Sequence, residues 1–187
     1  GQGYKSMVLV TLGTGVGGGI ILDGKPLHGT TGAAGEIGHM VLNRHETAVC
    51  GCGKSGCVEQ YCSATGIARL TRLALAESDA PSSLRAVEKI MAKDVFDAAN
   101  GGDKLAQDVL EQVYAYMGEF IANICCVVNP EVIVLGGGVS AAGEFLLNAV
   151  HARLTQYVFF KTMPYARVEL AKLTNDAGII GAAMLGR

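Results

Sequence analysis

The stretch Met7–Leu27, MVLVTLGTGVGGGIILDGKPL, decides the fold that the sequence predicts. Met7–Leu12 is a short apolar run rich in β-branched residues, which is typical of a buried strand. A second apolar run, Ile20–Leu22, follows the glycines, and the Asp-Gly pair that begins at Asp23 is a turn signal. The chain then returns through Lys25–Leu27. The first part of the sequence therefore predicts an antiparallel meander.

Beyond this stretch, helical and strand patterns alternate. Further strands are expected at Ile37–Leu42, Glu131–Leu135 and Arg167–Ala171. Helices are expected from Ser63 onward with Leu73 on the apolar face, at Ser83–Met91, Ala92–Ala99, Asp103–Val128 and Ala142–Phe159, and from an N-cap at Asp176 to Leu185. A meander followed by alternating helices and strands predicts an α/β domain with a mixed sheet.

Composition excludes several classes of function. The chain has 187 residues, half of them apolar, and a net charge of −2, with its 15 Lys and Arg residues scattered. No basic run indicates a nucleic-acid or membrane surface. Polar residues and a proline interrupt the longest apolar stretch, Phe120–Val139, so it does not predict a membrane span. We see no signal peptide and expect a cytoplasmic protein.

One His and three Cys residues have the spacing of a metal site, His39-x10-Cys50-x-Cys52-x4-Cys57. Three thiolates and an imidazole complete a closed tetrahedral zinc shell, and the intervening glycines let the backbone curl around an ion. Disulfide bonding is one alternative, although a Cys-x-Cys pair makes a strained ring. Three unrelated buried thiols are a second alternative, and Cys62 could compete as a ligand.

Two glycine-rich turns follow predicted strands. The segment from Gly13 to Gly18 satisfies G-x-G-x-x-G, but a strand rather than a helix follows it, so a dinucleotide site is not expected. Two alternatives remain: an ordinary hairpin, or one whose N–H groups and Thr14 receive phosphate oxygens. The pattern of Val132–Ser140 predicts a strand, then three glycines, then the start of a helix. The glycines either let a flat ligand or a phosphate approach the helix N-terminus or form an ordinary tight turn.

Four segments in order, TLGTGVGGGI, GEIGH, CGCGKSGCVE and NPEVIVLGGG, resemble the ROK family of sugar kinases and sugar-responsive repressors, most closely its glucokinases. The resemblance covers nearly the whole chain. It implies an α/β, actin-like ATPase (ribonuclease H-like) fold with a mixed sheet. Residues 1–187 would form its single large C-terminal lobe, with a zinc-binding loop at 39–57 and the N-terminal lobe absent.

The resemblance also implies roles for individual residues. The zinc ligands would be His39, Cys50, Cys52 and Cys57, and the sugar-binding residues would be Glu36, His39 and Glu59. The phosphate hairpin would be Gly13, Thr14 and Gly15, and the adenosine-side turn would be Gly136, Gly137 and Gly138. The chemistry agrees, because carboxylates accept charge-assisted hydrogen bonds from sugar hydroxyls and an imidazole can bind zinc through one nitrogen while offering the other.

The implied function is phosphorylation of glucose to glucose 6-phosphate by a full-length parent, with ATP and Mg²⁺, a structural Zn²⁺ and a homodimeric or homotetrameric assembly. The family's Asp-x-Gly-x-Thr loop and its general-base Asp are not found here. Asp176 reads as an N-cap, so no catalytic residue is assigned and the chain as given is expected to be inactive. The alternatives are the sugar-sensing lobe of a ROK repressor, a kinase for another hexose such as N-acetylmannosamine, and a zinc module serving assembly only.

Overall fold

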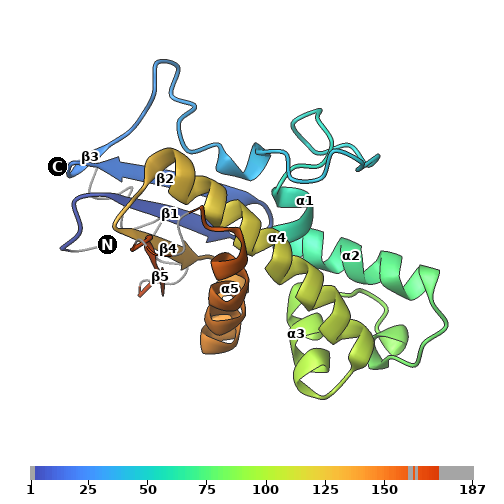
Figure 1. Cartoon of the computed structure of the whole chain (residues 1–187). Coiled ribbons are helices and arrows are strands. Elements are labelled where there is room, and N and C mark those ends of the chain that lie inside the picture. Colours follow the sequence, from blue (N-terminus) through green and yellow to red (C-terminus); the bar gives the residue numbers. More distant parts are fainter. Residues whose placement is uncertain (1–2, 160–161, 163, 173–187) are drawn as a thin grey trace.

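The computed structural model describes residues 3–159, 162 and 164–172, which form a five-stranded sheet with helices packed against it (Figure 1). The strands are β1 (Met7–Leu12), β2 (Val16–Leu22), β3 (Lys25–Pro26), β4 (Val132–Gly136) and β5 (Arg167–Leu170). The helices are α1 (Glu59–Cys62), α2 (Ala64–Glu77), α3 (Ala92–Asn100), α4 (Lys104–Val128) and α5 (Gly143–Tyr157). Short 3-10 helices are η1 (Ile37–His39), η2 (Ser83–Ala86) and η3 (Gly138–Ala142).

The sheet is mixed, as predicted, with the order β3-β2-β1-β4-β5. The first three strands pair antiparallel, and β1 and β5 flank β4 in parallel. Side chains of β1 alternate between buried and half-buried, whereas every residue of β4 is buried. A strand that is buried throughout has cover on both faces, which is usual for parallel strands in α/β proteins.

Helix α4 connects the sheet to the rest of the molecule. Its Asp103 N-cap accepts a hydrogen bond from the Ala106 N–H at 3.1 Å, and its far end stops at Asn129 in the left-handed conformation. One stretch of α4 lies over the sheet, and the other extends past it to α2 and α3 (Figure 1). The predicted apolar face is confirmed, because each of its members is buried: Leu105, Val109, Val113, Met117, Phe120, Ile121 and Ile124.

The predicted strand at Ile37–Leu42 is wrong. Its first part is the 3-10 turn η1, in which the His39 N–H donates to the Glu36 carbonyl at 3.1 Å. Gly38 lies directly on β2, where an added Cβ would come within 2.0 Å of the Val16 carbonyl oxygen. The backbone of η1 therefore packs closely against β2, and this segment is not a strand of the sheet.

Three other expectations need correction. Only the short helix η2 forms within Ser83–Met91. Asp103 accepts hydrogen bonds from Ser82 and Ser83 at its start, and the backbone of Val87 is extended at its end. Strand β2 begins at Val16, four residues earlier than predicted, because glycines can pair through their backbone alone. Leu73 is 44% exposed, so it is not a core residue. The helix expected after Asp176 lies outside the described residues.

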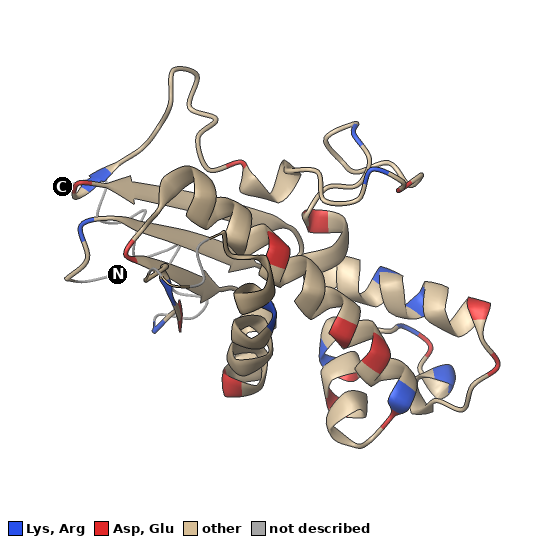
Figure 2. Cartoon of the chain, in the orientation of Figure 1, with Lys and Arg blue, Asp and Glu red and all other residues tan. Residues whose placement is uncertain are grey.

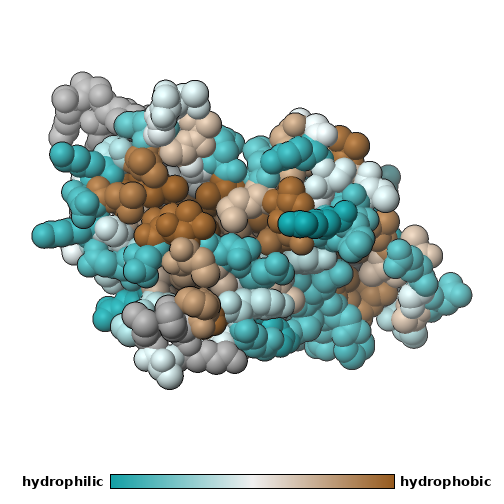
Figure 3. Space-filling view, turned by 45° about the horizontal axis from the view of Figure 1, so that its top comes forward, coloured by the Kyte–Doolittle hydropathy of each residue, from teal (hydrophilic) through white to brown (hydrophobic). Residues whose placement is uncertain are grey.

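The surface carries acidic and basic residues side by side (Figure 2). This mixture differs from the clustered Lys and Arg of nucleic-acid-binding faces. Apolar side chains also reach the surface in a band across the face drawn in Figure 3, and Val127 and Val49 are 80% and 71% exposed. Within the described part of the chain, none of the helices has the length and apolar character needed to cross a bilayer.

Candidate metal and sugar site

The four predicted zinc ligands lie together. One donor atom from each of His39, Cys50, Cys52 and Cys57 lies within 4.8 Å of all the others. The sulfurs of Cys52 and Cys57 are 3.6 Å apart, and the Cys50 sulfur is 3.8 Å from His39 Nδ1. Zinc bonds of about 2.3 Å in a tetrahedron separate two sulfurs by about 3.8 Å, so the spacing fits a zinc ion.

The alternatives to a metal site fit this geometry less well. All six cysteines are free thiols, and 3.6 Å between two sulfurs is far longer than a disulfide bond of about 2.05 Å. The thiols are also not unrelated, because they converge on one point together with an imidazole. Cys62 is fully buried and outside this group, so it does not compete as a ligand.

The backbone of the loop curls to bring these ligands together. The Cys50 N–H donates to the Lys54 carbonyl at 2.7 Å, and the Gly53 N–H donates back to the Cys50 carbonyl at 2.8 Å. Gly53 has a φ of 87°, which suits glycine. At Gly56 an added Cβ would come within 1.8 Å of the Asn43 carbonyl oxygen, so only glycine fits where the two arms of the loop cross.

The thiols of the cluster differ in how readily they ionise. Burial, together with the neighbouring sulfurs of Cys52 and Cys50, raises the pKa of the Cys57 thiol to about 12. The pKa of Cys52 is lowered, chiefly by the Lys54 backbone N–H. A metal ion binds the thiolate and not the thiol, so metal binding must displace protons from this cluster.

The ring of His39 faces two ways. Its Nδ1 faces the Cys50 sulfur, and its Nε2 lies 3.8 Å from Glu36 Oε2. If Nδ1 binds zinc, Nε2 carries the proton and can donate it to an acceptor. The Glu36 side chain is 70% exposed, so its carboxylate is open to a ligand from solvent.

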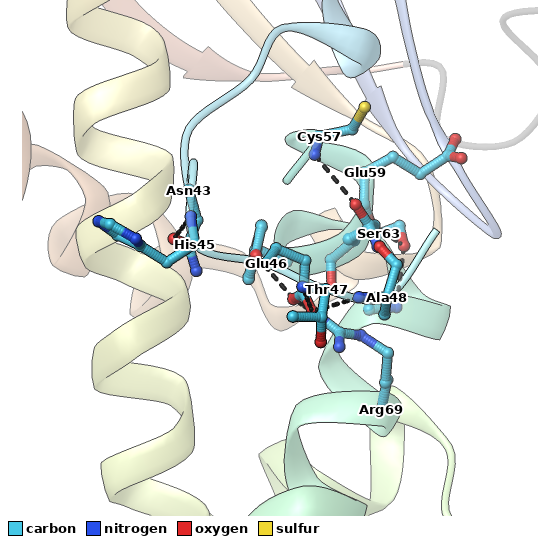
Figure 4. Close-up of polar contacts among 12 residues, drawn as sticks. Asn43, His45, Glu46, Thr47, Ala48, Cys57, Glu59, Ser63 and Arg69 are labelled. Carbon is cyan, nitrogen blue, oxygen red and sulfur yellow. Dashed lines mark hydrogen bonds and ion pairs between the residues drawn. The ribbon is translucent and has the colours of Figure 1, made fainter. Parts of the chain in front are cut away.

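Glu59 comes from α1 and links the cysteine loop to the β1–β2 hairpin. Its Oε2 accepts a hydrogen bond from the Val16 N–H at 3.0 Å, and its Oε1 lies 3.7 Å from the Cys50 sulfur. Figure 4 shows Glu59 extending away from Glu46 and Arg69, toward the blue strands of that hairpin. The predicted sugar carboxylate therefore lies against the predicted phosphate hairpin.

The two glycine motifs meet at one edge of the sheet. Strands β1 and β4 are parallel, and Thr11 is aligned with Gly136, so both turns follow at their carboxyl ends. Gly137 has a φ of 85°, and an added Cβ would come within 2.6 Å of the Leu12 backbone. Backbone conformation and packing alone therefore require a glycine at this position of the turn. Thr14, between the strands of the hairpin, is exposed.

Sequence reasoning missed the polar group that supports the loop. Glu46 Oε1 accepts hydrogen bonds from the Thr47 and Ala48 N–H groups, at 3.1 and 3.0 Å. Its Oε2 accepts from the Tyr61 hydroxyl at 2.7 Å and from Arg69 Nη2 at 2.8 Å (Figure 4). Burial alone would raise the pKa of Glu46, but these hydrogen bonds outweigh it and lower the pKa to about 2.

Gln60, in helix α1 directly after the loop, completes this support. Its Oε1 accepts the Cys57 N–H at 3.0 Å, and its Nε2 donates to the Ala48 carbonyl at 2.8 Å. The side chain is mostly buried, so it bridges the two arms of the loop directly. Neither Glu46 nor Gln60 carries a sequence signal, because a lone polar side chain normally faces solvent.

Known proteins share this architecture. A glucokinase from Halalkalibacterium halodurans is 44% identical over 188 residues, covering 99% of this chain and 57% of that protein. The crystal structure of a ROK family glucokinase from Streptomyces griseus, in complex with glucose and AMPPNP, matches with a TM-score of 0.89 and 33% identity, over 98% of this chain and 61% of its own. A ROK family transcriptional regulator, a homolog of the E. coli MLC protein, matches with a TM-score of 0.83 and 32% identity, over 98% and 46%.

These matches and the mixed sheet define the class of fold as that of the actin-like ATPases. The ROK family model matches residues 1–187. The chain belongs to the ROK family, and it spans somewhat more than half of the length of the glucokinases that it matches.

Proposed function

We propose that these residues supply the sugar site and part of the ATP site of a glucokinase, which transfers the γ-phosphoryl group of ATP to the 6-hydroxyl of glucose. The observation that carries the proposal is the hydrogen bond from the Val16 N–H to Glu59 at 3.0 Å, because it joins the carboxylate that we propose binds sugar to the hairpin that we propose binds phosphate. The similar glucokinase structure holds glucose and AMPPNP, which supports both ligands.

In this proposal the residues of the chain act by positioning. Glu36 and Glu59 accept hydrogen bonds from sugar hydroxyls, and His39 donates one from Nε2. A zinc ion held by His39 and the three cysteines would supply a cross-link that fixes these groups, and no chemistry. Such placement accounts for much of the rate in phosphoryl transfer, because little covalent chemistry is left to the protein.

The nucleotide side uses backbone more than side chains. The Thr14 hydroxyl and the N–H groups of Thr14 and Gly15 would donate to phosphate oxygens, with Mg²⁺ as the usual counter-ion. The Gly13 N–H donates to the Gly15 carbonyl at 2.9 Å, so Gly13 would contribute by shaping the turn. The turn at Gly136–Gly138 lets adenosine approach at the start of η3. The proton acceptor for the 6-hydroxyl is expected in the family's N-terminal lobe, which the C-terminal lobe proposed for 1–187 does not include. By itself this chain is then inactive.

The test is a substrate panel on the complete protein that contains this chain. Glucose, N-acetylmannosamine and other hexoses are offered with ATP, and the ADP that each reaction forms is measured in a coupled assay. We expect glucose to have the highest kcat/KM, and Glu59→Gln to weaken sugar binding while the zinc content stays unchanged. A protein that phosphorylates none of these sugars, or one for which Glu59→Gln has no effect, contradicts the proposal.

One observation favours a second function. The similarity to a ROK family transcriptional regulator covers as much of this chain as the similarity to glucokinases does. A sugar-sensing lobe would bind glucose through the same residues but would have no need of a phosphate hairpin. Sugar-dependent binding to DNA by the complete protein, together with no phosphoryl transfer, would favour this alternative.

A further inference from the structure

The carboxylate of Glu59 is held by the phosphate hairpin as well as by its own helix. Its Oε2 accepts the Val16 N–H at 3.0 Å, and this amide belongs to the first residue of β2. The hairpin is in turn fixed to the start of α2, where the Ala64 N–H donates to the Gly13 carbonyl at 2.8 Å and the Thr65 hydroxyl donates to the Thr14 carbonyl at 2.7 Å. The hairpin therefore has a defined position from which to orient the carboxylate.

Gly15 leaves the space that this carboxylate fills. A Cβ at Gly15 would lie 2.2 Å from Glu59 Oε2 and 3.1 Å from its Cδ, and those atoms are the far end of a flexible side chain. The fold can therefore accept alanine at this position, but the Glu59 carboxylate must move. Gly15 has no positive φ, so alanine introduces no backbone strain there.

Gly13 gives a matched comparison in the same hairpin. An added Cβ at Gly13 meets nothing within 4 Å, and its φ is not positive either. The two substitutions thus differ in one respect, which is the contact with Glu59. Both lie in the segment expected to contact phosphate and not in the segment expected to contact sugar.

We propose that Gly15 and Val16 are positioning residues for sugar binding, because the glycine makes room for the Glu59 carboxylate and the amide sets its direction. The inference rests on the proposed sugar-binding role of Glu59. It extends that role by making the affinity for the sugar depend on a backbone turn of the phosphate hairpin.

The test is isothermal titration of glucose into the zinc-loaded complete protein that contains this chain, and into its variants. Gly15→Ala should weaken glucose binding roughly tenfold or more, since a displaced carboxylate loses a charge-assisted hydrogen bond to the sugar. Gly13→Ala should leave glucose affinity within about twofold, and both variants should melt close to the parent. In a Glu59→Gln background, Gly15→Ala should weaken binding much less, because the two effects share one side chain.

A readout without sugar tests the contact itself. Amide hydrogen exchange at Val16 should become faster in Glu59→Ala and in Gly15→Ala, and should stay slow in Gly13→Ala. Equal glucose affinity for the parent and Gly15→Ala overturns the inference and leaves the proposed function standing. If the complete parent protein binds no hexose, the proposed sugar-binding role of Glu59 fails. In that case unchanged Val16 exchange in Gly15→Ala would overturn the positioning contact separately.

Discussion

Replacing Glu46 by glutamine should destabilise the protein strongly at neutral pH. The Glu46 side chain is only 13% exposed, and its carboxylate accepts two backbone and two side-chain hydrogen bonds. A pKa of about 2 in place of 4.5 corresponds to about 3 kcal/mol of stabilisation of the charged form. For a chain of this length, a loss of that size lowers the melting temperature by about 6–12 °C.

The sign of the pH dependence follows from the lowered pKa. The charged form of Glu46 is favoured by folding, so its contribution is complete above the unfolded pKa near 4.5 and is lost as pH falls toward about 2. The gap in stability between the parent and Glu46→Gln should therefore be constant near neutral pH and shrink between those two values.

The assay is urea unfolding at a series of pH values, with EDTA present so that loss of metal does not contribute. Asp97→Asn is the matched control, because the Lys93–Asp97 ion pair is exposed, at 81% and 59%, and should contribute little. A gap that stays the same down to the lowest pH, or a Glu46→Gln protein as stable as the parent at pH 7, would refute the reasoning.

Three other changes have defined outcomes. Cys52→Ser should lower both the zinc content, measured by elemental analysis, and the melting temperature. Cys126→Ser, which replaces another exposed thiol, should change neither. Full zinc content in Cys52→Ser would show that Cys52 is not a ligand. Zinc added to the metal-free chain should release protons into weakly buffered solution near neutral pH, because the Cys57 thiol has a pKa of about 12; titration without proton release would mean that the thiols do not bind. Gly118→Ala should cost about 1–3 kcal/mol in urea unfolding, since its Cβ would lie 2.7 Å from the Cβ of Arg153 on α5, and an unchanged midpoint would show that the helices can separate.

The metal cluster was predictable because its determinants are local. All four ligands fall between His39 and Cys57, and the same short segment contains the glycines that curl the backbone. Zinc restricts the type and the spacing of its donors so strongly that three cysteines and a histidine in this pattern favour a metal over a disulfide. Long apolar helices such as α4 were predictable for a similar reason, since a helical repeat sustained over many residues is not expected in a strand or a loop.

Errors occurred where tertiary contacts decide between short local patterns. Ile37–Leu42 has apolar residues that suit a strand, but packing of Gly38 on the backbone of Val16 selects a 3-10 turn. The glycines before Ile20 have no side chains that would indicate a strand. Strand β2 nevertheless starts at Val16, because the backbone of this run pairs with β1.

The Glu46 group could not have been found from the sequence. Its partners Tyr61 and Arg69 lie in different helices, and no spacing rule connects them to a glutamate in a polar loop. The hydrogen bond from the Val16 amide to Glu59 could not be predicted from the sequence either, because a backbone donor has no sequence signature. Such long-range polar contacts become visible only when the fold is known.

The parallel pairing of β1 with β4 has a consequence for biosynthesis. Met7 leaves the ribosome well before its partner Val132, which emerges only after α1, α2, α3 and α4. Throughout that interval one edge of the nascent hairpin has unpaired N–H and C=O groups, which is the kind of edge that recruits other chains. The cysteine loop needs no such distant partner, so a metal ion can order it while the central sheet is still being translated.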